Sequence, residues 1–439
     1  MIKKFTNVFI LTLISQIISL LSLSYIVKRN ATDSFLEFIA LLDSSYLIIN
    51  TLLSFGIIQI ASREIVVSEK WETVLAETQN IRLNFSYFLL LFGVLLLLIT
   101  KNDYFLVFLF SPLIALNVNY LFYANGRPQV ATKNASIRSF ILSFSLIFLG
   151  FFEYFSNKIY FCLFVLGLIY VAFASNYESQ TKIKYKINTA FFSKYSKSIW
   201  IGITDLAIIF LEFGILFFAT FFYRDTIVAE AYILIKIVTI VKGFQRMIFQ
   251  VFYDQLIQKA KAFLLDQIIL FIGFSFFVIS FFFSNEIFQI LYSKNNTLLN
   301  QNALFLSIAL LIGSFILASM ARTLIIKKDK IYIRSYIWSF ILSFFTMLVM
   351  SYSKLNIYGI SIALLVGEFA LFLSFFIGIY KDIDIQKYSI SILKYCFLFF
   401  IYYFVSKIII AQIFFIIVLI TQVSIAGVFL LENRKLLDK

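Results

Sequence analysis

Histidine is absent from the 439 residues, and cysteine and proline occur only twice each. Without histidine the chain can form no Ser-His-Asp or Cys-His catalytic group and no metal site with histidine ligands. The two cysteines, Cys162 and Cys396, lie in apolar stretches, so they indicate neither a disulfide framework nor a thiolate metal site. The sequence therefore predicts a protein with no metal and no cofactor.

Charge is also scarce, because only 14% of the residues are charged while 62% are hydrophobic. A soluble domain has about 25% charged residues and about 45–50% apolar residues. The hydrophobic fraction is enough for roughly thirteen or fourteen membrane spans of about 20 residues each. This composition excludes a water-soluble fold and a large soluble enzyme domain on a single membrane anchor.

Apolar stretches separated by polar clusters predict an all-α, polytopic membrane protein with about fourteen spanning helices. The expected spans are 5–27, 35–60, 83–100, 104–124, 137–155, 159–175, 199–222, 227–252, 267–284, 303–326, 335–353, 356–380, 389–409 and 411–431. The first stretch is longer than a signal-peptide core and no small-residue cleavage site follows it, so we expect it to stay as a helix.

The formal net charge of +14 is explained by membrane topology before nucleic acid, since lysine and arginine gather in cytoplasmic loops. With the amino terminus in the cytoplasm, 25 of the 37 Lys and Arg residues fall on the cytoplasmic side and eight on the other side. This bias predicts a membrane protein with both termini in the cytoplasm and no nucleic-acid partner.

A short repeat suggests two related halves. The octets 137–144 and 333–340 share six of eight residues, and each is expected to begin a helix with an arginine at the membrane entry. They lie six spans apart, which is an even number, so the halves form a parallel repeat of the kind found in transporters. We therefore predict a bundle over 1–198, a second bundle over 199–380, and an extra helix pair with a cytoplasmic tail over 381–439.

Basic residues inside predicted spans are candidates for a substrate cavity, because a charge at the bilayer centre costs at least about 2.5–3.5 kcal/mol. Lys236 is the strongest candidate, since its predicted depth is near the middle of the membrane. Lys242 and Arg246 lie closer to the inner surface, where snorkelling is an equally good explanation. Arg322 and the pair Lys28 and Arg29 complete the predicted substrate-binding set.

Acidic residues form a second set of candidates, consisting of Asp43, Asp205, Glu212 and Glu368. Asp205 and Glu212 are seven residues apart and so share a helix face. Two interpretations stay open for these carboxylates. Each could neutralise a basic residue such as Lys236 or Arg322, or one of them could take up H⁺ or Na⁺ to couple transport.

The segment 123–133, YANGRPQVATK, joins the fourth and fifth predicted spans through a Gly-Arg turn and a basic loop. Residues 322–334 are the matching basic connection of the second half. With its two six-helix halves and its first helix near the amino terminus, the chain resembles the multidrug/oligosaccharidyl-lipid/polysaccharide (MOP) exporter superfamily. Within it, the resemblance is to the polysaccharide-transporter branch of Wzx-type O-antigen flippases. Many of these have twelve helices, so the last pair is a departure or a family variant, and other branches do have fourteen.

This resemblance implies a flippase that moves an undecaprenyl-pyrophosphate-linked oligosaccharide, an O-antigen or capsule repeat unit, from the cytoplasmic to the periplasmic leaflet. Its implied partners are membrane lipid, H⁺ or Na⁺, and the glycan polymerase and chain-length machinery. The basic residues above would meet the pyrophosphate, while alternating access would expose the cavity to each side in turn.

Two other functions remain as alternatives. A cation-coupled drug antiporter of the same superfamily would use a cavity dominated by the four carboxylates. An integral glycan polymerase is disfavoured, because the longest extracytoplasmic loop, about 285–302, is short. No GxxxxGK[ST] phosphate loop occurs, so we expect no ATP hydrolysis and no enzymatic activity.

Overall fold

The computed structural model describes residues 2–67, 71–101, 103–180, 191–251, 256, 258–293, 297–326, 328–353, 355–380 and 385–437. These residues form helices and turns, and none of them lies in a strand. In hydrocarbon no water can bond to the backbone, and a helix satisfies its N–H and C=O groups internally. The predicted all-α membrane fold is confirmed.

The chain divides into two compact units, and four of the five boundaries between them fall within helices. The first unit comprises Met1–Ile237, Leu291–Lys294 and Met347–Ile360, and the second comprises Val238–Ile290, Asn295–Thr346 and Ser361–Lys439. The division into bundles at residues 198 and 380 stays a prediction from the sequence.

The helices up to α10 belong to the first unit. They are α1 (Ile2–Lys28), α2 (Asp33–Ser54), α3 (Ile57–Val67), α4 (Trp71–Thr100), η1 (Asp103–Phe110), α5 (Ser111–Ala115), α6 (Asn119–Ala124), α7 (Pro128–Phe151), α8 (Asn157–Ser179), α9 (Phe191–Ile209), the π-helical η2 (Phe210–Gly214) and α10 (Ile215–Ala219). Four helices contribute residues to both units, namely α11 (Asp225–Val251), α12 (Lys259–Tyr292), α15 (Asp329–Ser351) and α16 (Gly359–Ile379). The remaining elements are η4 (Asn356–Tyr358) in the first unit and α13 (Thr297–Ser314), α14 (Leu317–Ile325), α17 (Ile385–Ser406) and α18 (Ala411–Leu437) in the second.

Each of the fourteen predicted spans corresponds to helical segments of the structure. Within the described ranges, ten helices are long and apolar enough to cross a membrane, and the bent pair α13–α14 makes up to eleven. Among the other predicted spans, 104–124 is broken into three short pieces, and α11 carries Lys236, Lys242 and Arg246 along its length. In α18 the apolar stretch Gln412–Ile425 is shorter than the other spans.

The predicted span 35–60 is two helices rather than one. Thr32 caps the start of α2, where its side chain accepts a hydrogen bond from the backbone N–H of Phe35. The helix ends at Phe55, whose φ of 31° is left-handed, and Gly56 follows with a φ of 78°. Glycine adopts such a φ without strain, so the chain can turn here before α3 begins.

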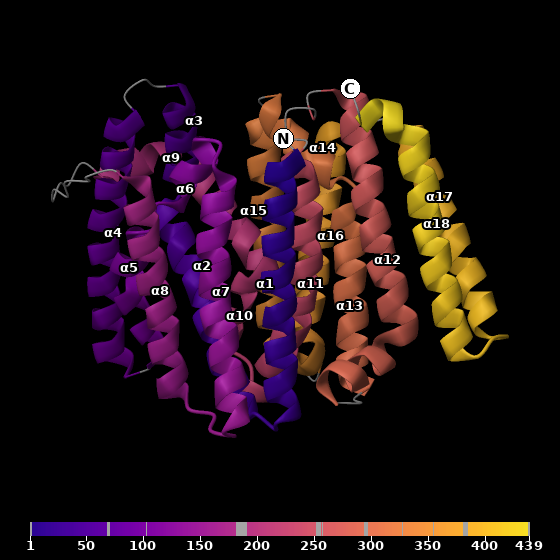
Figure 1. Ribbon diagram of the computed structural model, residues 1–439, viewed down its shortest axis with the longest axis horizontal. Coiled ribbons are helices and arrows are strands. Elements are labelled where there is room, and N and C mark those ends of the chain that lie inside the picture. The colour runs from indigo at the N-terminus through magenta and orange to yellow at the C-terminus, as the bar shows by residue number, and fades with distance from the viewer. Residues whose placement is uncertain are drawn as a thin grey trace. The chain divides into compact units, whose positions relative to one another are not determined.

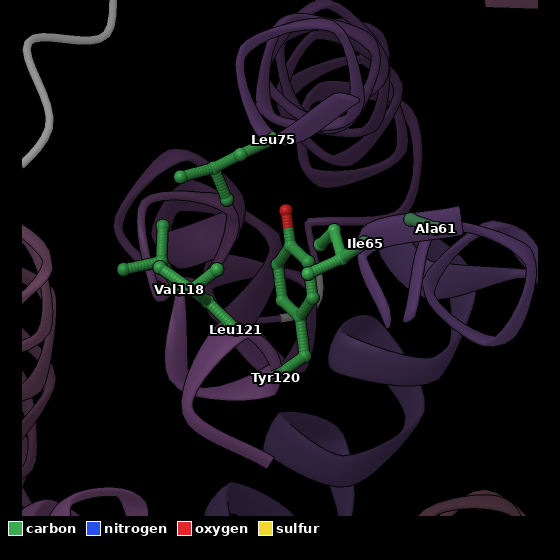
Figure 2. Close-up of a cluster of buried hydrophobic side chains, with 6 residues drawn as sticks. All are labelled: Ala61, Ile65, Leu75, Val118, Tyr120 and Leu121. Carbon is green, nitrogen blue, oxygen red and sulfur yellow. The ribbon is translucent and has the colours of Figure 1, made fainter. Parts of the chain in front are cut away.

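The predicted span 104–124 is interrupted because a buried arginine bonds to its backbone. Arg82 on α4 is only 1% exposed, and its guanidinium donates to the carbonyls of Asn117 at 2.6 Å and Ile114 at 3.3 Å. These carbonyls lie at the end of α5, where intrahelical partners run out. The connection to α6 packs through a cluster in which the Tyr120 ring lies among Ala61, Ile65, Leu75, Val118 and Leu121 (Figure 2).

The fifth predicted span begins nine residues earlier than the sequence pattern suggested. Helix α7 starts at Pro128, and proline suits the first position of a helix because its missing N–H has no partner there. Arg138 is therefore ten residues inside α7, and the expectation that residues 137–144 begin this helix is wrong. Helix α7 lies along α1 in the first unit (Figure 1).

In the second unit the helix pair α17 and α18 lies side by side and packs on α12 (Figure 1). Phe274 and Val278 of α12 meet Tyr402, Phe414 and Val418 of the pair in one buried cluster. Helices α13 and α14 are bent from one another by 48°.

Large apolar side chains remain exposed, such as Phe173 on α8 and Leu98 on α4, both 73% exposed, as lipid contact requires.

The close approach of α1 and α7 can be tested at Gly150, where an added Cβ atom would lie 2.9 Å from Cε1 of Tyr25. We expect Gly150→Ala to lower the free energy of unfolding by about 1–3 kcal/mol, because overpacking forces the two helices apart. Unfolding in detergent micelles measures the effect. Phe148→Ala on the same helix is the control, since its side chain is 59% exposed and we expect almost no change. Equal stability of Gly150→Ala and wild type would contradict this contact.

Candidate functional site

The first unit contains a polar cluster around Asp43, which we call the Asp43 cluster and which consists of Asp43, Tyr46, Arg138, Tyr160, Tyr232 and Lys236. Nζ of Lys236 on α11 lies 3.3 Å from Oδ2 of Asp43 on α2, and the Tyr232 hydroxyl donates to the same oxygen at 3.0 Å. Tyr232 and Lys236 are four residues apart on α11 and therefore share a face. The Lys236 and Asp43 side chains are 22% and 17% exposed, so the ion pair lies mostly inside the protein.

Aromatic rings surround the Lys236 ammonium. Its Nζ atom lies 5.6 Å from the ring centre of Phe213 and 5.8 Å from that of Tyr232. Phe213 belongs to η2, a π-helical turn between α9 and α10, and such turns are frequent at functional sites. The ring faces and one carboxylate thus hold the ammonium that the sequence predicted near mid-membrane.

Arg138 is the second cation of the Asp43 cluster, and aromatic rings rather than carboxylates hold it. The Cζ atom of its guanidinium lies 3.6 Å from the ring centre of Tyr46 and 5.3 Å from that of Phe164. Within the described ranges no group accepts a hydrogen bond from it, and its Nε atom is buried without a partner. Tyr160, which is 1% exposed, interacts electrostatically with both Asp43 and Arg138 and so connects the two ends of the cluster.

The charges of the Asp43 cluster are therefore two cations and one carboxylate, and that carboxylate is bonded to Lys236. Removing a charge from water costs several kcal/mol even after relaxation. A cation–π contact returns about 0.5–2 kcal/mol, which is less than the cost of removing a charge from water completely. The cluster can accept a further anion at Arg138, or at Lys236 if Asp43 is neutralised.

The second unit holds a separate group around Glu368, which we call the Glu368 cluster and which consists of Lys242, Arg246, Gly313, Tyr332, Tyr336 and Glu368. Lys242 and Glu368 form an ion pair at 2.5 Å, with side chains 16% and 7% exposed. Arg246, one turn further along α11, interacts electrostatically with Glu368 and with the two tyrosines. Gly313 gives the carboxylate room, since a Cβ atom there would lie 2.7 Å from Oε2 of Glu368.

A third buried carboxylate, Asp266 on α12, was not among the predicted site residues. It is fully buried and accepts hydrogen bonds from the backbone N–H groups of Ala318 and Ser319 at 2.7 and 3.2 Å. The Ser319 and Tyr388 hydroxyls also donate to it, each at 2.5 Å. Since Ala318 and Ser319 belong to the first turn of α14, Asp266 caps that helix from another one. Because the backbone and two hydroxyl groups of the protein supply these hydrogen-bond donors, this carboxylate has a structural role.

The structure places the remaining predicted residues as follows. Lys28 is exposed at the end of α1, and Arg29 pairs with Glu153 at 3.0 Å with both side chains exposed. Asp205 on α9 and Arg322 on α14 are partly buried, while Glu212 is buried within η2. The predicted residues brought together are thus Lys236 with Asp43, and Lys242 and Arg246 with Glu368. Pairing of a carboxylate with Lys236 is one of the two interpretations that the sequence left open.

No candidate metal site with three or more His, Cys, Asp or Glu residues occurs in the part of the chain that the structure describes. Sequence reasoning missed Arg138 as a site residue because it placed the start of its helix too late. Pro128, directly after the Gly126-Arg127 turn, was the signal that could have located it. Nothing in the sequence selects Tyr46, Tyr160 and Tyr232 from the 25 tyrosines.

Comparison with known proteins places the fold. The sequence matches no protein-family model, and it matches no curated protein. Among solved structures, the lipid II flippase MurJ in an inward closed conformation aligns over 98% of this chain and 99% of its own, with a TM-score of 0.69 and 16% identity. An inward-facing multidrug resistance MATE transporter of the MOP superfamily covers 86% of this chain and 95% of its own, with a TM-score of 0.61 and 13% identity. The eukaryotic MATE transporter AtDTX14 covers 90% and 97%, with a TM-score of 0.51 and 13% identity. The chain therefore has the fold of MOP-superfamily transporters.

The Asp43–Lys236 pair can be tested with a double-mutant cycle. We expect Asp43→Asn and Lys236→Gln each to destabilise the protein, because each leaves a charge inside without its partner. The double variant should lose less than the sum, with a coupling energy of roughly 0.5–3 kcal/mol. The exposed Arg29–Glu153 pair is the control and should show no measurable coupling. Strict additivity at Asp43 and Lys236 would mean that the two side chains do not interact.

A second test concerns Asp266. We expect Asp266→Ala to lower the free energy of unfolding by at least about 3 kcal/mol, because several buried donors lose a charged acceptor. Asp266→Asn keeps one acceptor oxygen and should lose less. Thermal and denaturant unfolding in detergent measure both variants. If Asp266→Ala unfolds like the wild type, the carboxylate does not hold the start of α14.

Proposed function

We propose that the protein is a flippase for an undecaprenyl-pyrophosphate-linked oligosaccharide, an O-antigen or capsule repeat unit, which it carries from the cytoplasmic to the periplasmic leaflet. The observation that carries this proposal is the Asp43 cluster, which holds two cations among aromatic rings inside a membrane fold. The alignment with the lipid II flippase over nearly the whole of both chains supports it.

The physical requirement is to replace the water around a pyrophosphate. An ionised group that enters hydrocarbon without partners loses hydration worth many kcal/mol, whereas the lipid tail can remain in the bilayer. Cations supply the charge compensation, and tyrosine hydroxyls and rings suit the sugar part. Alternating access between the two predicted bundles, 1–198 and 199–380, would then open the passage to each side in turn.

Asp43 has a defined part in this proposal, as the internal counter-ion of Lys236 when no passenger is bound. A lysine that is paired with a carboxylate attracts a second anion only weakly until that carboxylate is protonated or displaced. Uptake of H⁺ by Asp43 would free Lys236 for the pyrophosphate, and loss of the proton would restore the pair and release the passenger. Na⁺ is the other candidate ion, with Asp205, Glu212 and Glu368 as further coupling candidates.

A cation-coupled drug antiporter is the second candidate, and the fold similarity to the MATE transporter favours it. Its passenger is a cation, which would have to displace a lysine from Asp43 or from Glu368. The lysines are fixed to the helix and compete at very high effective concentration, so these carboxylates are poor sites for a free cation. This competition makes an anionic passenger the better match.

The proposed function implies where the protein lies and which partners it has. The ten or more apolar helices make this a multi-pass membrane protein. We propose that the protein lies in the bacterial inner membrane with both termini in the cytoplasm. We also propose that it acts together with the glycan polymerase and chain-length machinery. We expect no nucleic-acid partner and no catalysis, which sets aside the integral polymerase.

The test is Lys236→Ala in the host cell, with surface polysaccharide measured by gel analysis at equal protein levels. We expect loss of most surface glycan and accumulation of its lipid-linked precursor, because the passenger loses a cation inside the membrane. Lys158→Ala, at an exposed position at the start of α8, is the matched control and should behave like the wild type. Normal surface glycan together with a new sensitivity to cationic drugs would replace the flippase with the antiporter.

A further inference from the structure

We propose that Arg138 and Tyr46 form an oxyanion-binding subsite in the first unit, distinct from the ion pair of Lys236. The inference rests on the proposed function, because it assumes an anionic passenger. It goes beyond that function because it names the group that binds the anion. The guanidinium of Arg138 on α7 would bond to two oxygens of one anionic group, and no site residue was predicted on this helix.

The depth of Arg138 is the first argument. It lies ten residues after Pro128, which is about 15 Å along α7 at the rise of an α-helix. Arg334, at the matching position of the second octet, lies only five residues after the start of α15 and is exposed. Of two arginines in nearly identical sequences, only Arg138 is therefore placed deep within its helix.

The orientation of the guanidinium is the second argument. The Cζ atom of Arg138 lies 3.6 Å from the ring centre of Tyr46. A guanidinium stacked on a ring at such a distance keeps its N–H groups at the edge of the contact. This edge is the fork that matches two oxygens of a phosphate or carboxylate. Gly167 on α8 accommodates the aliphatic part, since a Cβ atom there would lie 3.3 Å from Cγ of Arg138.

The missing acceptor is the third argument. In the described part of the chain, no oxygen accepts a hydrogen bond from Arg138, although its Nε atom is buried. Buried donors in native proteins almost always have acceptors, and an exception needs an explanation. The Asp43 carboxylate is bonded to Lys236 and Tyr232, and an oxyanion carried by a ligand would supply the acceptor that Arg138 lacks.

The chemistry that this subsite recognises is the two-oxygen face of an oxyanion. A lipid-linked oligosaccharide offers that face from two sources, the pyrophosphate of the lipid and the carboxylate of an acidic sugar. Farnesyl pyrophosphate in micelles and free glucuronate are probes that separate the two sources, and inorganic pyrophosphate shows whether the lipid tail contributes.

The experiment measures binding of the three probes to the purified full-length protein by isothermal titration calorimetry. Arg138→Lys keeps the charge but loses the fork, and we expect it to weaken binding of the preferred probe about tenfold or more. Tyr46→Phe keeps the ring and should bind like the wild type, whereas Tyr46→Ala should bind more weakly. Arg334→Lys is the matched control from the second octet and should leave binding unchanged.

Stability without ligand distinguishes this subsite from a merely structural arginine. We expect the melting temperature of Arg138→Met to be equal to or above that of the wild type, because the variant removes a partly buried cation whose buried Nε atom has no acceptor. A structural arginine would instead give a lower melting temperature and unchanged affinity, and that result would overturn the proposal. Unchanged affinity of Arg138→Lys for every probe, or no binding by the wild type, would also overturn it.

The outcomes separate this inference from the proposed function. If Lys236→Ala abolishes surface glycan but the Arg138 variants bind normally, the flippase stands and the subsite falls. If surface glycan does not depend on the protein but binding still depends on Arg138, the oxyanion subsite stands and belongs to another passenger.

Discussion

A charge inside hydrocarbon needs a partner, and this constraint organises the interior of the protein. Arg82 donates to backbone carbonyls at the end of α5, and Asp266 accepts from backbone N–H groups at the start of α14. Lys236 and Lys242 each bond to a carboxylate from another helix. In every case the partner lies on a different element, so the pairing also fixes how helices pack. Apolar contacts alone could not do this, because lipid tails are as apolar as the side chains.

The two kinds of partner differ in whether their charge can be neutralised. Arg82 and Asp266 bond to the backbone, which cannot be protonated or exchanged, and they hold breaks between helices in place. A carboxylate that holds a lysine can be neutralised by one proton, which turns a neutral pair into a cationic site. In the cycle that we propose, the pairs of Lys236 and Lys242 would change state, while the bonds of Arg82 and Asp266 to the backbone hold the helix ends around them.

The sequence predicted the helices well because membrane insertion depends on local hydropathy along the chain. It predicted the breaks poorly, since the interruption after α5 depends on Arg82 from α4, which is far away in sequence. Hydropathy also placed the start of α7 too late, because its first turns contain polar residues, and only Pro128 marked the beginning. The choice of partners for Lys236 and Lys242 required three dimensions, since the sequence offered four carboxylates and no means of assigning them.

The basic residues of α11 show why that assignment changes the functional argument. Lys236 and Lys242 are six residues apart, which is about one and two-thirds turns of an α-helix, so they point to different sides. The structure describes two clusters that each contain a carboxylate, one around Lys236 in the first unit and one around Lys242 in the second, and a single cavity lined by both lysines stays a prediction. If the passenger is an anion, as we propose, its selection cannot come from the number of basic residues, since each lysine already has its counter-ion. It depends instead on which cation lacks a carboxylate, and in the Asp43 cluster that cation is Arg138, held on the ring of Tyr46.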